Sequence, residues 1–181
     1  RARSTIHCSM GRPKEGAVVE RFRSDAKAEG ENIVVGGWEV HRADGRRTDT
    51  QEARWFKVVL DRKSAPWAYS RGEPFRVIAA LELLGTLLSI KVLMLEEKSA
   101  GRTAAGTAAR AVGRISAGGS TDNQGNRFIL NRLMTTKFPL LAFVGEMAAE
   151  LEEKNVLLDL GWVPRDQNQE ADAITNDNLG E

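Results

Sequence analysis

The chain has 181 residues, of which 41% are hydrophobic and 28% charged, and its formal net charge is +1. This length predicts one domain, since a domain takes roughly 150 residues, and a chain of this size can bury a core without covalent staples. The composition excludes a fibrous or wholly disordered chain. The apolar run from Val77 to Ile90 is interrupted by Glu82 and is shorter than the ~20 residues of a membrane span, so we expect no membrane contact.

Soft metal ligands are scarce in this sequence. Cys8, His7 and His41 are the whole set, which excludes a zinc cluster. A single cysteine cannot form an internal disulfide, so an intracellular location is favoured over secretion, with the cytoplasm and the nucleus both open.

Charge is unevenly distributed along the chain. Residues 145–181 carry two basic side chains against ten acids, which leaves a net charge of +9 on the remainder. A basic body suits a polyanion such as nucleic acid. A helix with a solvated acidic face explains the C-terminal acids more simply.

The first part of the chain predicts a tether followed by hairpins. Residues 1–16 lack periodicity and are expected to be a tether or the tail of a preceding domain. Three strands are predicted after it, at Ala17–Ala26, Asn32–Val40 and Ala53–Leu60. Because no helix separates them, they are expected to pair antiparallel.

A long helix and a basic segment come next. Pro74 can open a helix, and apolar residues recur at helical spacing from Val77 to Val92, so the helix is expected to end near Met94. The stretch from about 98 to 113 is rich in alanine and glycine and carries basic but no acidic side chains. We expect a flexible basic insertion there, within a domain that spans 17–181.

The last third predicts alternating strands and helices. The expected elements are a strand at 113–121, helices at 126–135 and 139–154, a strand at 156–163 and a helix from 170 to 176. Three hairpin-linked strands followed by this alternation predict an α/β fold with a mixed sheet and helices packed on it.

Four separated acids are the most informative residues. Asp25 is expected at the end of the first strand, Glu82 in mid-helix, Asp122 just past the fourth strand and Asp172 at the start of the last helix. Glu82 is anomalous because a carboxylate buried in an apolar helix is costly unless it is paired or bound to metal. Each acid also has an ordinary explanation, as a strand end or helix start, or, for Glu82, as an ion pair with Arg21 or Arg23.

The segments around these acids form an ordered set. They are Ser24-Asp25-Ala26 followed by Gly36-Gly37-Trp38, then Ala80-Leu81-Glu82-Leu83, Ser120-Thr121-Asp122-Asn123, and Trp162-Val163-Pro164 ahead of Asn168-Gln169-Glu170-Ala171-Asp172. In these segments, spread over most of the chain, the sequence resembles the ribonuclease H domain of non-retroviral retroelement reverse transcriptases. The resemblance implies the RNase H-like fold, a five-stranded mixed sheet with three antiparallel strands first.

The resemblance also implies a metal site and a reaction. Asp25 would bridge two Mg²⁺ ions, with Glu82 and Asp122 completing one site and Asp172 the other, and Mn²⁺ is expected to substitute. Carboxylate oxygens are the ligands that Mg²⁺ favours, and two such ions can drive hydrolysis of a phosphodiester. The implied activity is that of a ribonuclease H, an endonuclease that cuts the RNA strand of an RNA–DNA hybrid. The implied partner is a reverse transcriptase domain, covalently linked or associated.

Several residues are candidates for contact with the nucleic acid. They are Asn123, Gln124 and Asn126 beside Asp122, Arg102 and Arg110 in the basic insertion, and Trp67 in the loop after the third strand. Amide side chains can recognise a 2′-hydroxyl group, and an aromatic ring can stack on a base. The other three tryptophans, Trp38, Trp55 and Trp162, are expected in the core.

Some features depart from the family pattern. Residues 165–167 lack the histidine that many members carry before the final acid, which lowers the expected rate. Arg21 and Arg23 are expected on the same face of the strand as Asp25, which is unusual for the core face of a central strand. A bulge or pairing of these arginines with acids is therefore predicted. The alternative function is a catalytically idle RNase H-like scaffold or nucleic-acid-binding module in a larger assembly. A transposase or integrase of the same superfamily is disfavoured, because that plan leaves Glu82 unexplained.

Overall fold

The computed structural model describes residues 18–42, 44–94, 115–132, 135 and 137–176. The predicted tether at 1–16 and the whole of the predicted insertion at about 98–113, with Arg102 and Arg110, lie outside the described residues.

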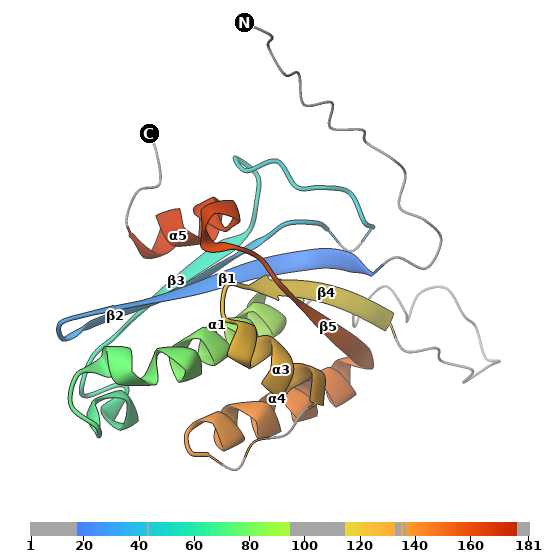
Figure 1. Ribbon diagram of the computed structural model, residues 1–181. Helices are drawn as coiled ribbons and strands as arrows, with labels where there is room; N and C mark the ends of the chain where they lie inside the picture. Colours follow the sequence, from blue (N-terminus) through green and yellow to red (C-terminus); the bar gives the residue numbers. More distant parts are fainter. Residues whose placement is uncertain (1–17, 43, 95–114, 133–134, 136, 177–181) are drawn as a thin grey trace, which may run out of the picture.

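The described strands form one sheet in the order β3-β2-β1-β4-β5 (Figure 1). The strands are β1 (Val19–Glu29), β2 (Asn32–Glu39), β3 (Trp55–Leu60), β4 (Ile115–Thr121) and β5 (Val156–Trp162). β2 pairs antiparallel with β1 and with β3, and β4 pairs parallel with β1 and with β5. The predicted mixed sheet with three antiparallel strands first is therefore confirmed.

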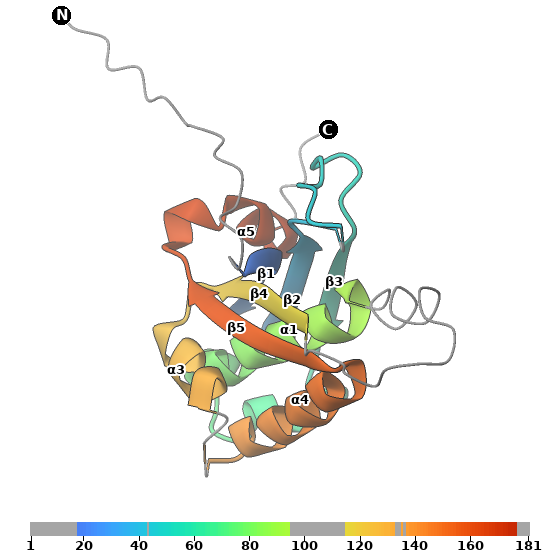
Figure 2. The same cartoon turned by 90° about the vertical axis from the view of Figure 1, so that its right-hand side faces the viewer.

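Helices cover both faces of this sheet unequally. The α-helices are α1 (Ile78–Leu93), α3 (Gln124–Arg132), α4 (Leu140–Lys154) and α5 (Gln169–Thr175). The described residues also form three 3₁₀ turns: η1 (Pro66–Tyr69) and η2 (Pro74–Val77) lie between β3 and α1, and η3 (Arg165–Gln167) lies between β5 and α5. Of the helices in the described part of the chain, α1, α3 and α4 lie on one face, and the short helix α5 lies on the other (Figures 1 and 2). None of the described helices has the length and apolarity to cross a bilayer.

The main core lies between the sheet and helices α1 and α4. Phe22 on β1 is fully buried there, together with Leu83, Ile90 and Met147. Gly119 on β4 leaves room for the Phe22 ring, because a Cβ at that position would lie 2.4 Å from Phe22 Cζ. The Phe22 ring thus fills the space that a side chain at Gly119 would occupy, and it packs directly on the backbone of β4.

The two arginines of β1 are accommodated as predicted. The register of β1 against β4 shifts between Glu20 and Phe22, which is the expected irregularity. Arg23 forms an ion pair with Glu20 at 2.9 Å, and Arg21 Nε donates to the carbonyl of His41 at 2.9 Å.

Two tryptophan predictions were wrong. Trp38 is buried as expected, but Trp55 is 51% exposed and Trp162 is 38% exposed. Trp55 begins β3 and Trp162 ends β5. Both are edge strands of the sheet, so each has a neighbouring strand on one side only. Trp67, predicted at the surface, is half-buried in η1, and its ring meets that of Phe143 edge-on with centroids 5.3 Å apart.

Candidate metal centre

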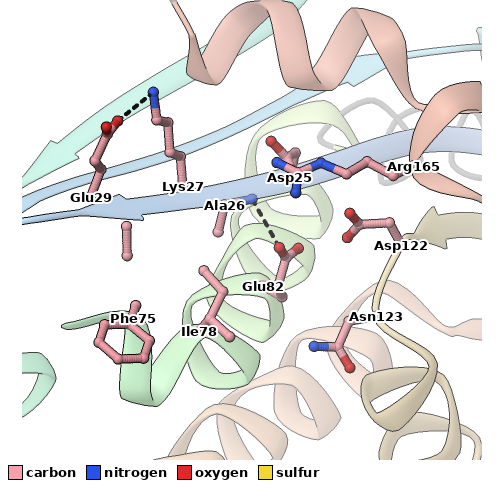
Figure 3. A pocket seen from close by; sticks show the side chains of 11 residues that line it. Asp25, Ala26, Lys27, Glu29, Phe75, Ile78, Glu82, Asp122, Asn123 and Arg165 are labelled. Carbon is pink, nitrogen blue, oxygen red and sulfur yellow. Dashed lines mark hydrogen bonds and ion pairs between the residues drawn. The ribbon is translucent and has the colours of Figure 1, made fainter. Parts of the chain in front are cut away.

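Three of the four predicted acids meet in one pocket. Asp25 comes from β1, Glu82 from α1 and Asp122 from the residue directly after β4. Each offers a carboxylate oxygen, and these oxygens all lie within 4.8 Å of one another. The pocket has a volume of about 480 Å³, and the three side chains extend into it from separate elements (Figure 3).

The sheet and its helix place these side chains. Asp25 lies within β1, not at the end of the strand as predicted, because β1 continues to Glu29. Asp122 stands at the carboxyl end of β4, where the indole Nε1 of Trp162 donates to its backbone carbonyl at 2.9 Å. α1 packs on β1 and brings Glu82 to Ala26, whose backbone N–H donates to Glu82 Oε1 at 3.3 Å. This hydrogen bond satisfies one oxygen of Glu82, and Arg23, one of the two arginines suggested as its ion-pair partner, pairs with Glu20 instead.

The buried carboxylate of Glu82 has one oxygen without a hydrogen-bond partner among the described residues. Its side chain is 4% exposed, and Oε2 has no hydrogen-bond partner among the described residues. Burial, together with the charges of Asp25 and Asp122, raises the pKa of Glu82 well above its ordinary value. A buried acceptor without a partner is costly, and a bound cation would remove that cost.

Burial raises the pKa values of the two aspartates as well. Burial raises the pKa of Asp25, a hydrogen bond from Thr175 opposes this, and the charges of Asp122 and Asp172 raise it further. Burial also raises the pKa of Asp122, and the charge of Arg165 opposes that rise. Hard oxygen donors, crowded like charges and an orphaned oxygen together fit a divalent cation such as Mg²⁺. The three acids are thus placed to hold a metal ion.

Asp172, the fourth acid, lies beside this cluster but is not part of it. It stands in the first turn of α5, with its side chain 38% exposed. Arg165 Nη2 lies 3.4 Å from Asp172 Oδ1. The charge of Asp172 nevertheless contributes, after the effect of burial, to the raised pKa of both Asp25 and Asp122.

Arg165 is a pocket residue that the sequence analysis missed. It extends from η3 toward Asp25 (Figure 3), and its charge lowers the pKa of Asp25, Glu82 and Asp122 against the larger effect of burial. The only signal in the sequence was its place in the loop where a histidine was absent.

The three amide residues predicted to contact nucleic acid differ in their exposure and in their place relative to the pocket. Asn123 lines the pocket, and Gln124 is exposed at the first residue of α3. Asn126 is fully buried and donates from Nδ2 to the carbonyl of Ala79 at 2.8 Å, which leaves it no accessible surface for a nucleic acid.

An apolar rim opposite Arg165 was also missed. Phe75, at the second residue of η2, lines the pocket with Ile78 and is 51% exposed. Asp122 and Asn123 lie across the pocket from Phe75, whereas the ion-paired Lys27 and Glu29 lie on the same side as Phe75 and Ile78 (Figure 3). Nothing in the sequence separates this phenylalanine from a core residue at the start of an apolar helix.

Comparison with known proteins gives a result for the fold. No family model matches the chain, and no curated protein matches it. Among solved structures, the chain is similar to the N-terminal RNase H domain of Rv2228c from Mycobacterium tuberculosis, with 16% identity, a TM-score of 0.51 and coverage of 87% of this chain and 91% of that one. It is also similar to RNase H1 from the archaeon Halobacterium salinarum, with 15% identity, a TM-score of 0.51 and coverage of 87% and 95%.

A third similar structure is LC11-RNase H1, a protein isolated from compost, in complex with an RNA/DNA hybrid. It shares 12% identity and a TM-score of 0.56, with coverage of 86% of this chain and 93% of that one. At 12–16% identity over most of each chain, these similarities concern the fold. The chain has the RNase H-like fold.

Proposed function

We propose that this protein is a ribonuclease H, a metal-dependent endonuclease that hydrolyses the RNA strand of an RNA–DNA hybrid. The observation that carries the proposal is the cluster of three carboxylates within 4.8 Å of one another, with one buried oxygen that lacks a partner. Its setting adds support, because the chain has an RNase H-like fold and one similar structure is described as a complex with an RNA/DNA hybrid.

In this function the acids hold divalent cations. Asp25, Glu82 and Asp122 would hold one Mg²⁺ ion, and Asp172 with Asp25 would complete a second site; Mn²⁺ is expected to substitute. Bound there, the metal would activate the attacking water and stabilise the leaving 3′ oxygen. The binding of cations also explains how four acids are tolerated, because it offsets the repulsion that raises the pKa of Asp25 and Glu82 beyond the effect of burial.

The walls of the pocket have their own roles. Arg165, opposite the apolar rim, would attract the phosphate backbone and carry part of its charge. Asn123 offers an amide to a 2′-hydroxyl, the group that distinguishes RNA from DNA. Phe75 and Ile78 offer an apolar surface to a sugar or base beside the cleaved bond.

We also propose that the domain acts within a reverse transcriptase polyprotein, with the reverse transcriptase domain as its linked or associated partner. This context rests on the motif segments around Asp25, Glu82, Asp122 and Asp172. It is tested by fusing the chain to a reverse transcriptase domain and asking whether cleavage follows the position of the polymerase on the hybrid. Cleavage that ignores the polymerase would contradict the proposed context.

The function is tested with a labelled RNA–DNA hybrid in Mg²⁺, in Mn²⁺ and in EDTA, with duplex DNA and duplex RNA as controls. Asp122→Asn and Asp25→Asn are expected to abolish cleavage and to leave the fold intact, whereas Asp159→Asn, which changes an exposed acid on β5, is expected to cleave normally. Metal-dependent cutting of the RNA strand alone would support a ribonuclease H. A folded protein that cuts nothing with either metal would support the idle scaffold instead.

A further inference from the structure

A buried hydroxyl group, that of Thr175, contacts the Asp25 carboxylate of the candidate metal centre. Thr175, the last residue of α5, is 2% exposed. Its Oγ1 lies 2.6 Å from Asp25 Oδ2 and 3.1 Å from the backbone carbonyl oxygen of Asp172. A hydroxyl group has one hydrogen, and a separation of 2.6 Å is typical of a strong hydrogen bond from a hydroxyl to a carboxylate. Thr175 therefore donates to Asp25 while it stays next to the main chain at Asp172.

The seating of α5 on the sheet makes this contact possible. Gly36 on β2 is the register partner of Asp25 on β1. A Cβ on Gly36 would lie 2.7 Å from Ile174 Cγ2 and 3.3 Å from Thr175 Cγ2, so α5 reaches the strands only because this position is a glycine. Ile174 is itself buried against Trp38. The close approach fixes the height of Thr175 above the Asp25 carboxylate.

The contact links two acids that come from distant parts of the chain. A carboxylate rotates about its terminal bond unless something holds it, and the Thr175 hydroxyl holds one of the two oxygens of Asp25. The helix that supplies this hydroxyl is also the helix that carries Asp172. Any movement of α5 away from the sheet would release Asp25 and withdraw Asp172 together.

We propose that Thr175 is a positioning residue, whose hydroxyl holds the Asp25 carboxylate in its metal-binding orientation and couples it to the seating of α5. This inference rests on the proposed function, because it concerns the metal that the proposed reaction needs. It goes beyond that function in assigning a role to a residue that is not an acid and does not reach the substrate. Hydrogen-bonding partners of metal ligands typically contribute 10–100-fold in metal affinity.

The test is Mn²⁺ binding by the full chain, measured by titration calorimetry without nucleic acid and well below the unfolding temperature. Thr175→Val keeps the shape of the side chain and removes the hydroxyl group, and it should weaken Mn²⁺ binding by about 10–100-fold. Thr175→Ser keeps the hydroxyl group and should bind within about threefold of the parent. Thr48→Val is the matched control, a buried threonine outside the pocket whose Oγ1 has no hydrogen-bond partner among the described residues.

A double variant separates positioning from simple loss of structure. If Thr175 acts through Asp25, then Thr175→Val should weaken Mn²⁺ binding no further in an Asp25→Asn background. An undiminished effect in that background, or parental Mn²⁺ binding by Thr175→Val, would overturn the positioning role. Absence of Mn²⁺ binding by the parent would overturn both this role and the proposed metal site. Normal Mn²⁺ binding with the expected variant effects, but without hybrid cleavage, would leave the role intact and overturn only the ribonuclease activity.

Discussion

Replacing Glu82 with glutamine should stabilise the metal-free protein. The carboxylate is buried, one of its oxygens has no partner among the described residues, and two other acids lie within 4.8 Å. Glu82→Gln keeps the shape and the acceptor for the N–H of Ala26, and it removes the charge. A residue that the proposed function requires therefore works against the stability of the free chain.

The size of the gain follows from the geometry. Two unit charges 4.8 Å apart repel each other by about 3.5 kcal/mol at an effective dielectric constant of ~20. The protein avoids part of this cost by taking up protons, so we expect the free energy of unfolding to rise by about 1–3 kcal/mol. For a chain of this size, such a gain raises Tm by roughly 2–12 °C.

The pH dependence of unfolding tests independently whether Glu82→Gln stabilises the protein. Burial and the charges of Asp25 and Asp122 raise the pKa of Glu82, so this group binds more protons in the folded than in the unfolded state. Well below the unfolded-state pKa of about 4.3, the carboxyl is neutral in both states, and ionisation of Glu82 no longer separates the stabilities of the parent and Glu82→Gln. As the pH rises from there through the raised pKa, the parent loses stability relative to the variant.

The assay is thermal unfolding in EDTA from pH 4 to pH 8, followed by circular dichroism, and then repeated with Mn²⁺. We expect the advantage of Glu82→Gln in EDTA to disappear or reverse with Mn²⁺, because only the parent gains the full binding energy of the ion. A variant that is less stable than the parent in EDTA at neutral pH, by the same amount at every pH, would refute the reasoning.

Three further substitutions test the surroundings of the acids. Phe75→Ala should raise KM for the hybrid about fivefold to 150-fold with little change in kcat, because stacking of a base on an aromatic ring contributes about 1–3 kcal/mol; an equal effect of Trp55→Ala, which is equally exposed but outside the pocket, would argue against a specific contact. Gly36→Ala should cost about 1–3 kcal/mol in unfolding free energy and weaken Mn²⁺ binding, because its Cβ would collide with Ile174; unchanged Mn²⁺ binding would show that the seating of α5 does not matter. Arg165→Ala should tighten Mn²⁺ binding about threefold in calorimetry, because a competing cation is removed from an exposed position; weaker binding would contradict that role.

The sheet and three of the acids could be predicted because their signals are local. Close succession of strands without a helix requires antiparallel pairing, and a carboxylate in an apolar helix is visible without any structure, as Glu82 was. Asp122 was predictable because it directly follows the strand expected at 113–121, which ends at Thr121 in the structure. Asp25 was assigned to the correct strand, but its place at the strand end was wrong, since the strand continues through alternating residues to Glu29.

The rest of the site depends on packing between distant segments. Thr175 has no sequence signal, because its role comes from the seating of α5 on Gly36, 139 positions earlier in the chain. Asn126 looked like a surface amide near Asp122, yet a helix that begins at Gln124 turns it inward to Ala79. Composition and spacing contain neither of these facts, because both depend on which side of an element faces its neighbour.

The most direct measurement is a crystal of the protein grown with Mn²⁺, with the ion located by its anomalous scattering. The three carboxylates are placed to hold a divalent cation, so a peak is expected between Asp25, Glu82 and Asp122, with a second toward Asp172. In Asp122→Asn crystals under the same conditions, the first peak should weaken or vanish. A well-ordered parent pocket without a peak at saturating Mn²⁺, or a peak only at other acids, would contradict the proposed metal centre.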